Sequence, residues 1–193
     1  TWLLANVYDA KGDTVQAEAA LLKTIGLNPE VGGVYQALAK LYLKLKQPAK
    51  AVAKLEERVA ANPKDLDAFL LKALIHEQNK EYDKARKDYE KILDVNPNIS
   101  SVQNNLAYLL SERLGETDKA FELAQAARKK NPNDAALADT LGWLHYKRGE
   151  YAAALPLLAE SARKLATEPE VQFHLGLAAY MMGDETLAKT ALQ

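Results

Sequence analysis

The stretch QALAKLYLKLKQPAKAVAKLEERVAANPK, residues 36–64, carries two short amphipathic patterns with a break between them. Apolar residues recur every three or four positions around Ala39 and again around Ala51, which predicts two helices. Pro48 stands where the second helix would begin, a position at which its missing N–H does no harm. Asn62 precedes a proline, which disfavours helical backbone and ends the second helix. The stretch predicts a helix–turn–helix unit.

The same unit recurs through the chain at intervals of 34 or 35 residues. Each first helix has at its middle what we call the central small residue: Ala5, Ala39, Ala73, Ala107, Gly142 and Gly176. Each second helix has an alanine at a matching position: Ala17, Ala51, Ala85, Ala120, Ala154 and Ala188. A fixed period of this length is typical of repeat architectures in which each unit packs on its neighbours.

The break between the two helices is a glycine in four of the six units, at Gly12, Gly115, Gly149 and Gly183. Glycine suits a residue that ends a helix in the left-handed conformation. Lys46 and Lys80 occupy this position in the second and third units, so those turns must close without glycine. Pro156 lies inside a second helix, where we expect it to remove a hydrogen bond and bend the helix.

Residues 4–30, 36–64 and 140–162 (TLGWLHYKRGEYAAALPLLAESA) resemble tetratricopeptide repeats. The resemblance covers essentially the whole chain. It implies an all-α fold, a right-handed superhelical solenoid of antiparallel helix pairs in about six repeats with partial terminal units. The predicted units are 1–31, 32–65, 66–99, 100–134, 135–168 and 169–193. We expect one array over 1–193 that is part of a longer protein.

The C-terminal half has a narrower resemblance. NNLAYLL (104–110), the stretch 137–158 and PEVQFHLGLAAY (169–180) resemble repeats of bacterial envelope and exopolysaccharide-associated proteins, including the PEP-CTERM-type group. The compartment stays open between the cytoplasm and the periplasmic side of a bacterial envelope. The absence of cysteine fits either location.

The charge of the chain excludes one class of partner. Its 25 basic and 26 acidic residues give a net charge of −1. A chain without a basic stripe lacks the electrostatic footprint of a nucleic-acid binder. No apolar run approaches the roughly 18 residues that a membrane span requires, so we expect no direct membrane insertion.

Helical spacing sorts the residues of each first helix into two faces. Residues four and one before the central small residue, and three after it, are expected to face the interior. The resemblance implies that the remaining face lines an inner groove. In the last three units this groove is predicted to be rich in aromatic residues. The predicted partner-binding residues are Asn104, Asn105, Tyr108, Asp139, Thr140, Trp143, Tyr146, Phe173, Leu177 and Tyr180. His174 is also expected to face the groove.

Trp143 has two interpretations. It binds a partner in the groove, or the sixth unit covers it through Phe173 or Leu177. Tyr146 is the stronger candidate for binding, because a tyrosine hydroxyl requires a polar or wet partner.

No catalytic, metal-binding or cofactor-binding pattern is present. The three histidines include no pair at ligand spacing on one helix, and His145 is expected to be a packing residue. Neither a phosphate-binding glycine loop nor a nucleophile motif occurs. We therefore predict no enzyme activity, no metal and no cofactor.

Three functions fit the sequence. The preferred one is a non-catalytic scaffold that binds a partner protein or peptide in the groove. The alternative is a self-assembly module that forms homo-oligomers through the solenoid ends or the groove. A further alternative is an array that positions a catalytic domain elsewhere in the parent chain.

Overall fold

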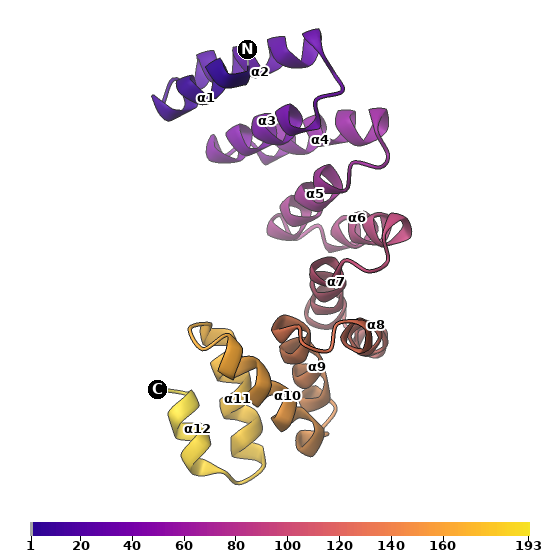
Figure 1. Ribbon diagram of the computed structural model, residues 1–193, viewed down its shortest axis with the longest axis vertical. Helices are drawn as coiled ribbons and strands as arrows, with labels where there is room; N and C mark the ends of the chain where they lie inside the picture. The colour runs from indigo at the N-terminus through magenta and orange to yellow at the C-terminus, as the bar shows by residue number, and fades with distance from the viewer. Residues whose placement is uncertain (1) are drawn as a thin grey trace. The chain divides into compact units, whose positions relative to one another are not determined.

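The computed structural model describes residues 2–193, and over these residues every regular element is an α-helix (Figure 1). The first helices of the successive pairs are α1 (Trp2–Ala10), α3 (Gly32–Lys44), α5 (Leu66–Gln78), α7 (Ser100–Glu112), α9 (Ala135–Lys147) and α11 (Pro169–Met181). The second helices are α2 (Thr14–Leu27), α4 (Pro48–Ala61), α6 (Tyr82–Val95), α8 (Thr117–Lys130), α10 (Tyr151–Lys164) and α12 (Glu185–Ala191). The all-α prediction is confirmed, and each predicted repeat range contains one helix pair.

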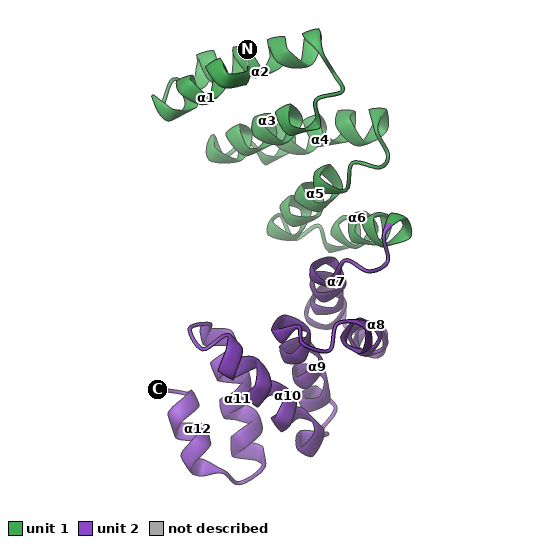
Figure 2. Ribbon diagram, in the orientation of Figure 1, with its two compact units in different colours: residues 1–95 green, residues 96–193 purple. Residues whose placement is uncertain are grey.

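The helices group into two compact units (Figure 2). Unit 1 comprises residues 1–95 and holds α1 to α6, and unit 2 comprises residues 96–193 and holds α7 to α12. Within each unit, both helices of a pair pack on each other, and the second helix packs on the first helix of the next pair.

The turn inside each pair is closed by a residue in the left-handed conformation. Gly149 has φ 77°, and the two lysines in the equivalent position, Lys46 and Lys80, have φ 57° and 62°. The turn after α5 shows the bonding, since the Glu81 N–H donates to the His76 carbonyl at 2.8 Å. This six-residue closure satisfies carbonyls that a helix end would leave bare. The lysine turns therefore adopt the glycine geometry at a conformational cost.

The two small-residue series set how closely helices approach. Ala39, Ala51 and Ala154 are completely buried. At Gly142 a Cβ atom would lie 2.8 Å from Leu158 Cγ, so α9 and α10 are in contact at this point. Both series are confirmed as packing positions. Small side chains there let the larger apolar ones around them interdigitate.

The buried core includes residues that the sequence pattern did not predict. The residues two after the central small residue are buried as well: Leu41, Ile75, Leu109, Leu144 and Ala178. So are the residues five before it: Val34, Ala68, Val102, Leu137 and Val171. Each first helix inside a unit packs against its own second helix and against neighbouring pairs, so its apolar stripe is wider than a two-helix argument predicts.

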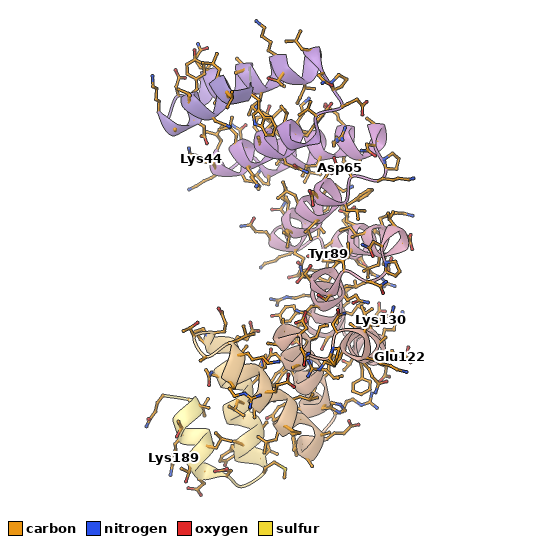
Figure 3. The ribbon with its side chains drawn as sticks, viewed as in Figure 1. Lys44, Asp65, Tyr89, Glu122, Lys130 and Lys189 are labelled. Carbon is orange, nitrogen blue, oxygen red and sulfur yellow. The ribbon has the colours of Figure 1, made fainter. Side chains whose placement is uncertain are left out.

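Unit 1 contains buried polar contacts that join helices. Tyr89 is fully buried and donates from its hydroxyl to Glu77 Oε2 at 2.7 Å (Figure 3). Arg58 is buried and pairs with Asp65 Oδ2 at 2.6 Å. Tyr42 donates to Glu18 Oε1 at 2.8 Å, and burial together with the Glu18 carboxylate raises the pKa of Tyr42 to about 12.

α10 continues through Pro156 without interruption, so this proline does not end the helix. Its ring lies on an exposed side, where the lost N–H leaves a carbonyl that water can reach.

Replacing Lys46 or Lys80 with glycine should stabilise the protein by about 0.5–1 kcal/mol each, because the strain of a left-handed lysine exceeds the added entropy of glycine in the unfolded chain. Urea unfolding measures this. The matched control Gly149→Ala should destabilise by a similar amount, and an unchanged or lowered stability in both lysine variants would contradict the assignment.

Tyr42 should make stability fall at high pH. Its pKa is about 12 in the folded protein against an ordinary 10.0, so the neutral phenol stabilises the fold fully below pH 10. That contribution is lost as the pH rises from 10 to 12. The free energy of unfolding of wild type relative to Tyr42→Phe should therefore be constant below pH 10 and decrease above it. A difference independent of pH would refute this.

Candidate functional site: the first-helix face of unit 2

The predicted groove residues of the last three pairs lie on α7, α9 and α11, which are successive first helices in contact within unit 2. We call this surface the first-helix face of unit 2. Its members are Asn104, Asn105, Tyr108, Asp139, Thr140, Trp143, Tyr146, Phe173, Leu177 and Tyr180.

The members differ in exposure. Tyr180 and Phe173 are the most exposed, at 66% and 49%. Asn104, Asn105, Tyr108, Asp139, Trp143, Tyr146 and Leu177 are half-buried. Thr140 is buried, so the expectation that its side chain faces an open groove is wrong. Its hydroxyl donates to Asn104 Oδ1 at 2.6 Å, and this bond draws Thr140 against α7.

One face of Trp143 is covered by His174. The two rings stack with centroids 4.1 Å apart and an interplanar angle of 14°. On the same helix Tyr146 stacks on Trp143 at 4.8 Å and 6°. The three rings form a continuous stack across α9 and α11, which fixes the orientation of the indole.

His174 itself is only 5% exposed, so the expectation that it faces the groove is wrong. Its Nδ1 lies 3.0 Å from Asp139 Oδ2 and 3.1 Å from Asp139 Oδ1. The Asp139 carboxylate accepts the Nδ1 proton and holds the imidazole flat against Trp143. The physical reason for the burial is this pairing with the preceding first helix.

A second polar link between α7 and α9 involves Lys147. Lys147 Nζ donates to Glu112 Oε1 at 2.8 Å and to Ser111 Oγ at 2.9 Å. Burial acts to raise the pKa of Glu112, but the hydrogen bonds from Lys147 and Ser111, together with one from Trp143, outweigh it and hold that pKa below its usual value. Glu112 is therefore ionised and fully engaged with its neighbours at neutral pH.

Tyr108 reaches from α7 to α11, where its hydroxyl donates to Glu170. Burial, and then the negative charge of Glu170, raise the pKa of Tyr108. This contact links the first and third of the three first helices.

The space among these groups is small. The hollow has a volume of about 10 Å³, which is room for about one water molecule. Its lining consists of Tyr108, Ser111, Glu112, Asp139, Thr140, Trp143, Leu144 and His174. The arrangement is a packed platform with rings exposed at its surface. Among residues 2–193 no group of three or more histidines, cysteines or carboxylates is placed to hold a metal ion.

The sequence contains a signal for these polar links, which is the separation of the linked residues along the chain. The linked residues are 36 apart for Asn104 and Thr140, and 35 apart for Asp139 and His174 and for Glu112 and Lys147. Each spacing is close to one repeat. Polar residues separated by about one repeat on the inner face are therefore candidates for bonds between adjacent first helices.

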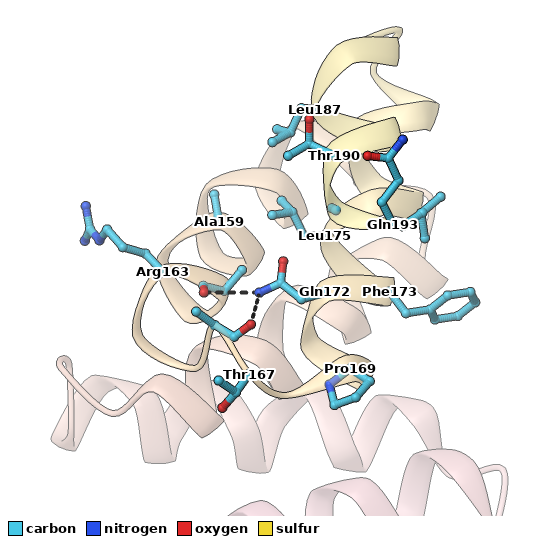
Figure 4. A pocket seen from close by; sticks show the side chains of 14 residues that line it. Ala159, Arg163, Thr167, Pro169, Gln172, Phe173, Leu175, Leu187, Thr190 and Gln193 are labelled. Atoms are coloured by element: carbon cyan, nitrogen blue, oxygen red, sulfur yellow. Dashed lines mark hydrogen bonds between the residues drawn. The ribbon is translucent and has the colours of Figure 1, made fainter.

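A larger hollow of about 990 Å³ lies elsewhere in unit 2, among α10, α11 and α12 (Figure 4). Ala159, Ala162, Phe173 and Leu175 are among the residues that line it. α12 has seven residues and α10 has fourteen, and the hollow lies beside the shorter helix. Its lining is mixed, with apolar residues beside the polar side chains of Arg163, Thr167, Gln172, Thr190 and Gln193.

The family model for the tetratricopeptide repeat matches residues 37–98, 81–135 and 140–192. The chain belongs to the tetratricopeptide repeat family. TPR proteins generally act as non-catalytic scaffolds for protein interaction. No helix within residues 2–193 combines the length and apolarity needed to cross a bilayer.

The chain is similar to parts of longer proteins. It is 29% identical over 130 residues to a TPR repeat-containing protein of Pseudomonas aeruginosa, covering 67% of this chain and 22% of that one. It is 27% identical over 133 residues to the mouse protein O-mannosyl-transferase TMTC1, covering 67% of this chain and 14% of that one. The chain thus spans about a fifth or less of the length of these relatives.

Two solved TPR structures share its fold. Pseudomonas aeruginosa pilF has a TM-score of 0.78 at 20% identity, covering 98% of this chain and 86% of that one. YrrB, described as a TPR protein with an unusual peptide-binding site, has a TM-score of 0.68 at 19% identity, covering 89% and 88%. These likenesses confirm the predicted TPR solenoid.

Replacing His174 with alanine should expose the Trp143 indole to water. In a Trp2→Phe background, where Trp143 is the remaining tryptophan, His174→Ala should shift its emission to longer wavelength and destabilise unit 2 by about 1–3 kcal/mol, because the Asp139 carboxylate loses its donor. His174→Phe keeps a ring on the indole and should restore the emission while the loss of stability remains. An unchanged spectrum in His174→Ala would rule out the stack.

Proposed function

We propose that this chain is a non-catalytic interaction module that binds a segment of a partner protein on the first-helix face of unit 2. The single observation that carries the proposal is the Tyr146–Trp143–His174 ring stack, in which Trp143 and Tyr146 stay partly exposed to solvent. Large rings left partly in water on one face of a folded unit are typical of an interaction site.

The energetics favour a partner that buries these rings. Burying a large apolar side chain contributes roughly 1.5–3 kcal/mol, so several rings together supply a specific but moderate affinity. The rings are also preorganised. Trp143 is held by His174 and Tyr146, so little side-chain entropy remains to be lost when a partner binds.

Charge supports the same proposal. The charged groups beside the rings already have partners within unit 2, with Lys147 on Glu112 and His174 on Asp139. A partner that brought its own charges would compete with these pairs. The peptide-binding site named for YrrB, a protein of the same fold, is consistent with a peptide as the partner segment.

The C-terminal repeats also have a narrower resemblance to envelope and exopolysaccharide-associated proteins, and this extends the proposal to the cellular compartment. We propose a partner on the periplasmic side of a bacterial envelope, with the cytoplasm as the alternative.

Self-assembly is the second candidate function. The observation that favours it lies in unit 1, where α1 and α2 expose the apolar residues Leu3, Leu4, Val7 and Val15. A second copy could cover this face. Sedimentation at rising protein concentration distinguishes the two candidates, because self-assembly requires a mass that increases with concentration.

The double variant Trp143→Ala/Tyr146→Ala should lose at least tenfold in partner binding, because it removes the centre of the ring stack, while circular dichroism reports unchanged helical content. Pull-down from a native lysate followed by titration with the captured partner measures the loss. The milder variant Phe173→Ala/Tyr180→Ala changes only exposed rings and should weaken binding without altering stability.

Met182→Ala is the matched control. Met182 is 47% exposed and follows α11 directly, at a helical position away from the first-helix face. It should bind as wild type does. Full binding by both ring variants would refute the proposed function.

A further inference from the structure

The third helix pair, α5 with α6, has charged side chains at interior positions where other pairs have leucine. The residue just before the central small residue is Lys72 in this pair, and in the other five pairs it is Leu4, Leu38, Leu106, Leu141 or Leu175. The leucines of the second, fourth, fifth and sixth pairs are buried. The residue three after the matching alanine of the second helix is Asp88 in this pair, whereas the fourth and fifth pairs have Leu123 and Leu157.

Lys72 and Asp88 belong to a chain of polar contacts between α5 and α6. Lys72 Nζ lies 3.0 Å from Asp88 Oδ1, and the two side chains are only 12% and 8% exposed. His76 is also buried, with its Nε2 3.7 Å from Asp88 Oδ2 and its Nδ1 2.6 Å from Glu81 Oε2. An ionic chain thus occupies the interior of this pair.

The chain of contacts leaves Asp88 incompletely paired. Its Oδ2 is buried and makes no hydrogen bond within residues 2–193. Burial raises the pKa of Asp88, although the hydrogen bond and the charge of Lys72 act to lower it. A buried ion pair offsets its desolvation only where the remaining lone pairs are hydrogen-bonded as well. The Lys72–Asp88 pair therefore contributes less to stability than two packed leucines would.

The second pair of unit 1, α3 with α4, does not have this cost. Leu38 is fully buried at the position of Lys72. Lys54 stands at the position of Asp88, but its Nζ pairs at 2.7 Å with Glu57, whose side chain is 51% exposed. Repeat arrays lose structure locally, in cooperative segments that often coincide with one helix pair. The pair with the least favourable interior opens most readily.

We propose that the α5–α6 pair is a built-in weak point of unit 1, which opens by local unfolding while α3 and α4 remain folded. When the pair opens, the Lys72 ammonium and the Asp88 carboxylate regain their hydration, whereas leucines at the same positions would expose apolar surface to water. The pair thereby gives unit 1 an element that changes conformation without unfolding its neighbours. The inference is independent of the proposed function, because it concerns unit 1 alone.

Amide hydrogen exchange at pH 7, expressed as protection factors, tests this. In the wild type, α5 and α6 should be at least tenfold less protected than α3 and α4. Lys72→Leu/Asp88→Leu gives the third pair the residues of the fourth and fifth pairs, and should raise the protection of α5 and α6 at least tenfold. Lys72→Leu alone leaves the Asp88 carboxylate buried without its cation, and should lower that protection at least tenfold.

Lys54→Leu is the matched control, since it removes a lysine at the equivalent position of α4 and should leave the protection of α5 and α6 unchanged. Equal protection of the two pairs in the wild type would overturn the weak point. A double variant with wild-type protection in α5 and α6 would also overturn the inference, because fraying of the last pair of unit 1 would then explain the opening. These two outcomes decide the inference even if Lys72→Leu alone fails to fold.

Discussion

Paired helices approach each other most closely at the small residues. This close approach determines how the larger apolar side chains around them pack. A Cβ atom added at Gly142 would lie 2.8 Å from Leu158 Cγ, which is closer than van der Waals contact, and the equivalent alanines are buried. Because these crossings recur once in each repeat, the larger apolar residues around them pack in the same way in every pair. The first helices are thereby held in register, and their remaining faces are available for other contacts.

A second layer of interactions acts between adjacent first helices in unit 2. Thr140 bonds to Asn104, His174 pairs with Asp139, and Lys147 pairs with Glu112. These links cross from one repeat to the next. As a result, the Trp143 and Tyr146 rings lie against side chains whose positions are fixed by hydrogen bonds between repeats.

Most of the fold could be predicted from the sequence, because spacing of small residues, glycines and prolines reports directly on helix crossings and turns. The same register placed Lys46 and Lys80 in the turns, but their left-handed conformation was not predicted. The width of the core could not be predicted in this way, because the burial of Leu41 and Leu144 depends on neighbouring pairs that a single amphipathic helix does not reveal.

The candidate site was predictable only in part. The ring positions followed from helical spacing, but His174 and Thr140 were expected to be open and are buried by bonds to the preceding helix. Side-chain pairing between repeats decides which positions on the inner face stay exposed, and that pairing requires the helix-to-helix geometry.

Photo-crosslinking from two positions near the end of α11 tests whether the partner binds the first-helix face of unit 2. Tyr180 and Met182 are both exposed and near each other in the sequence, but Tyr180 belongs to the first-helix face and Met182 does not. With p-benzoylphenylalanine placed at each position in turn, we expect a crosslinked partner from position 180 and none from position 182. A partner captured from position 182 alone, or equally from both, would contradict this expectation.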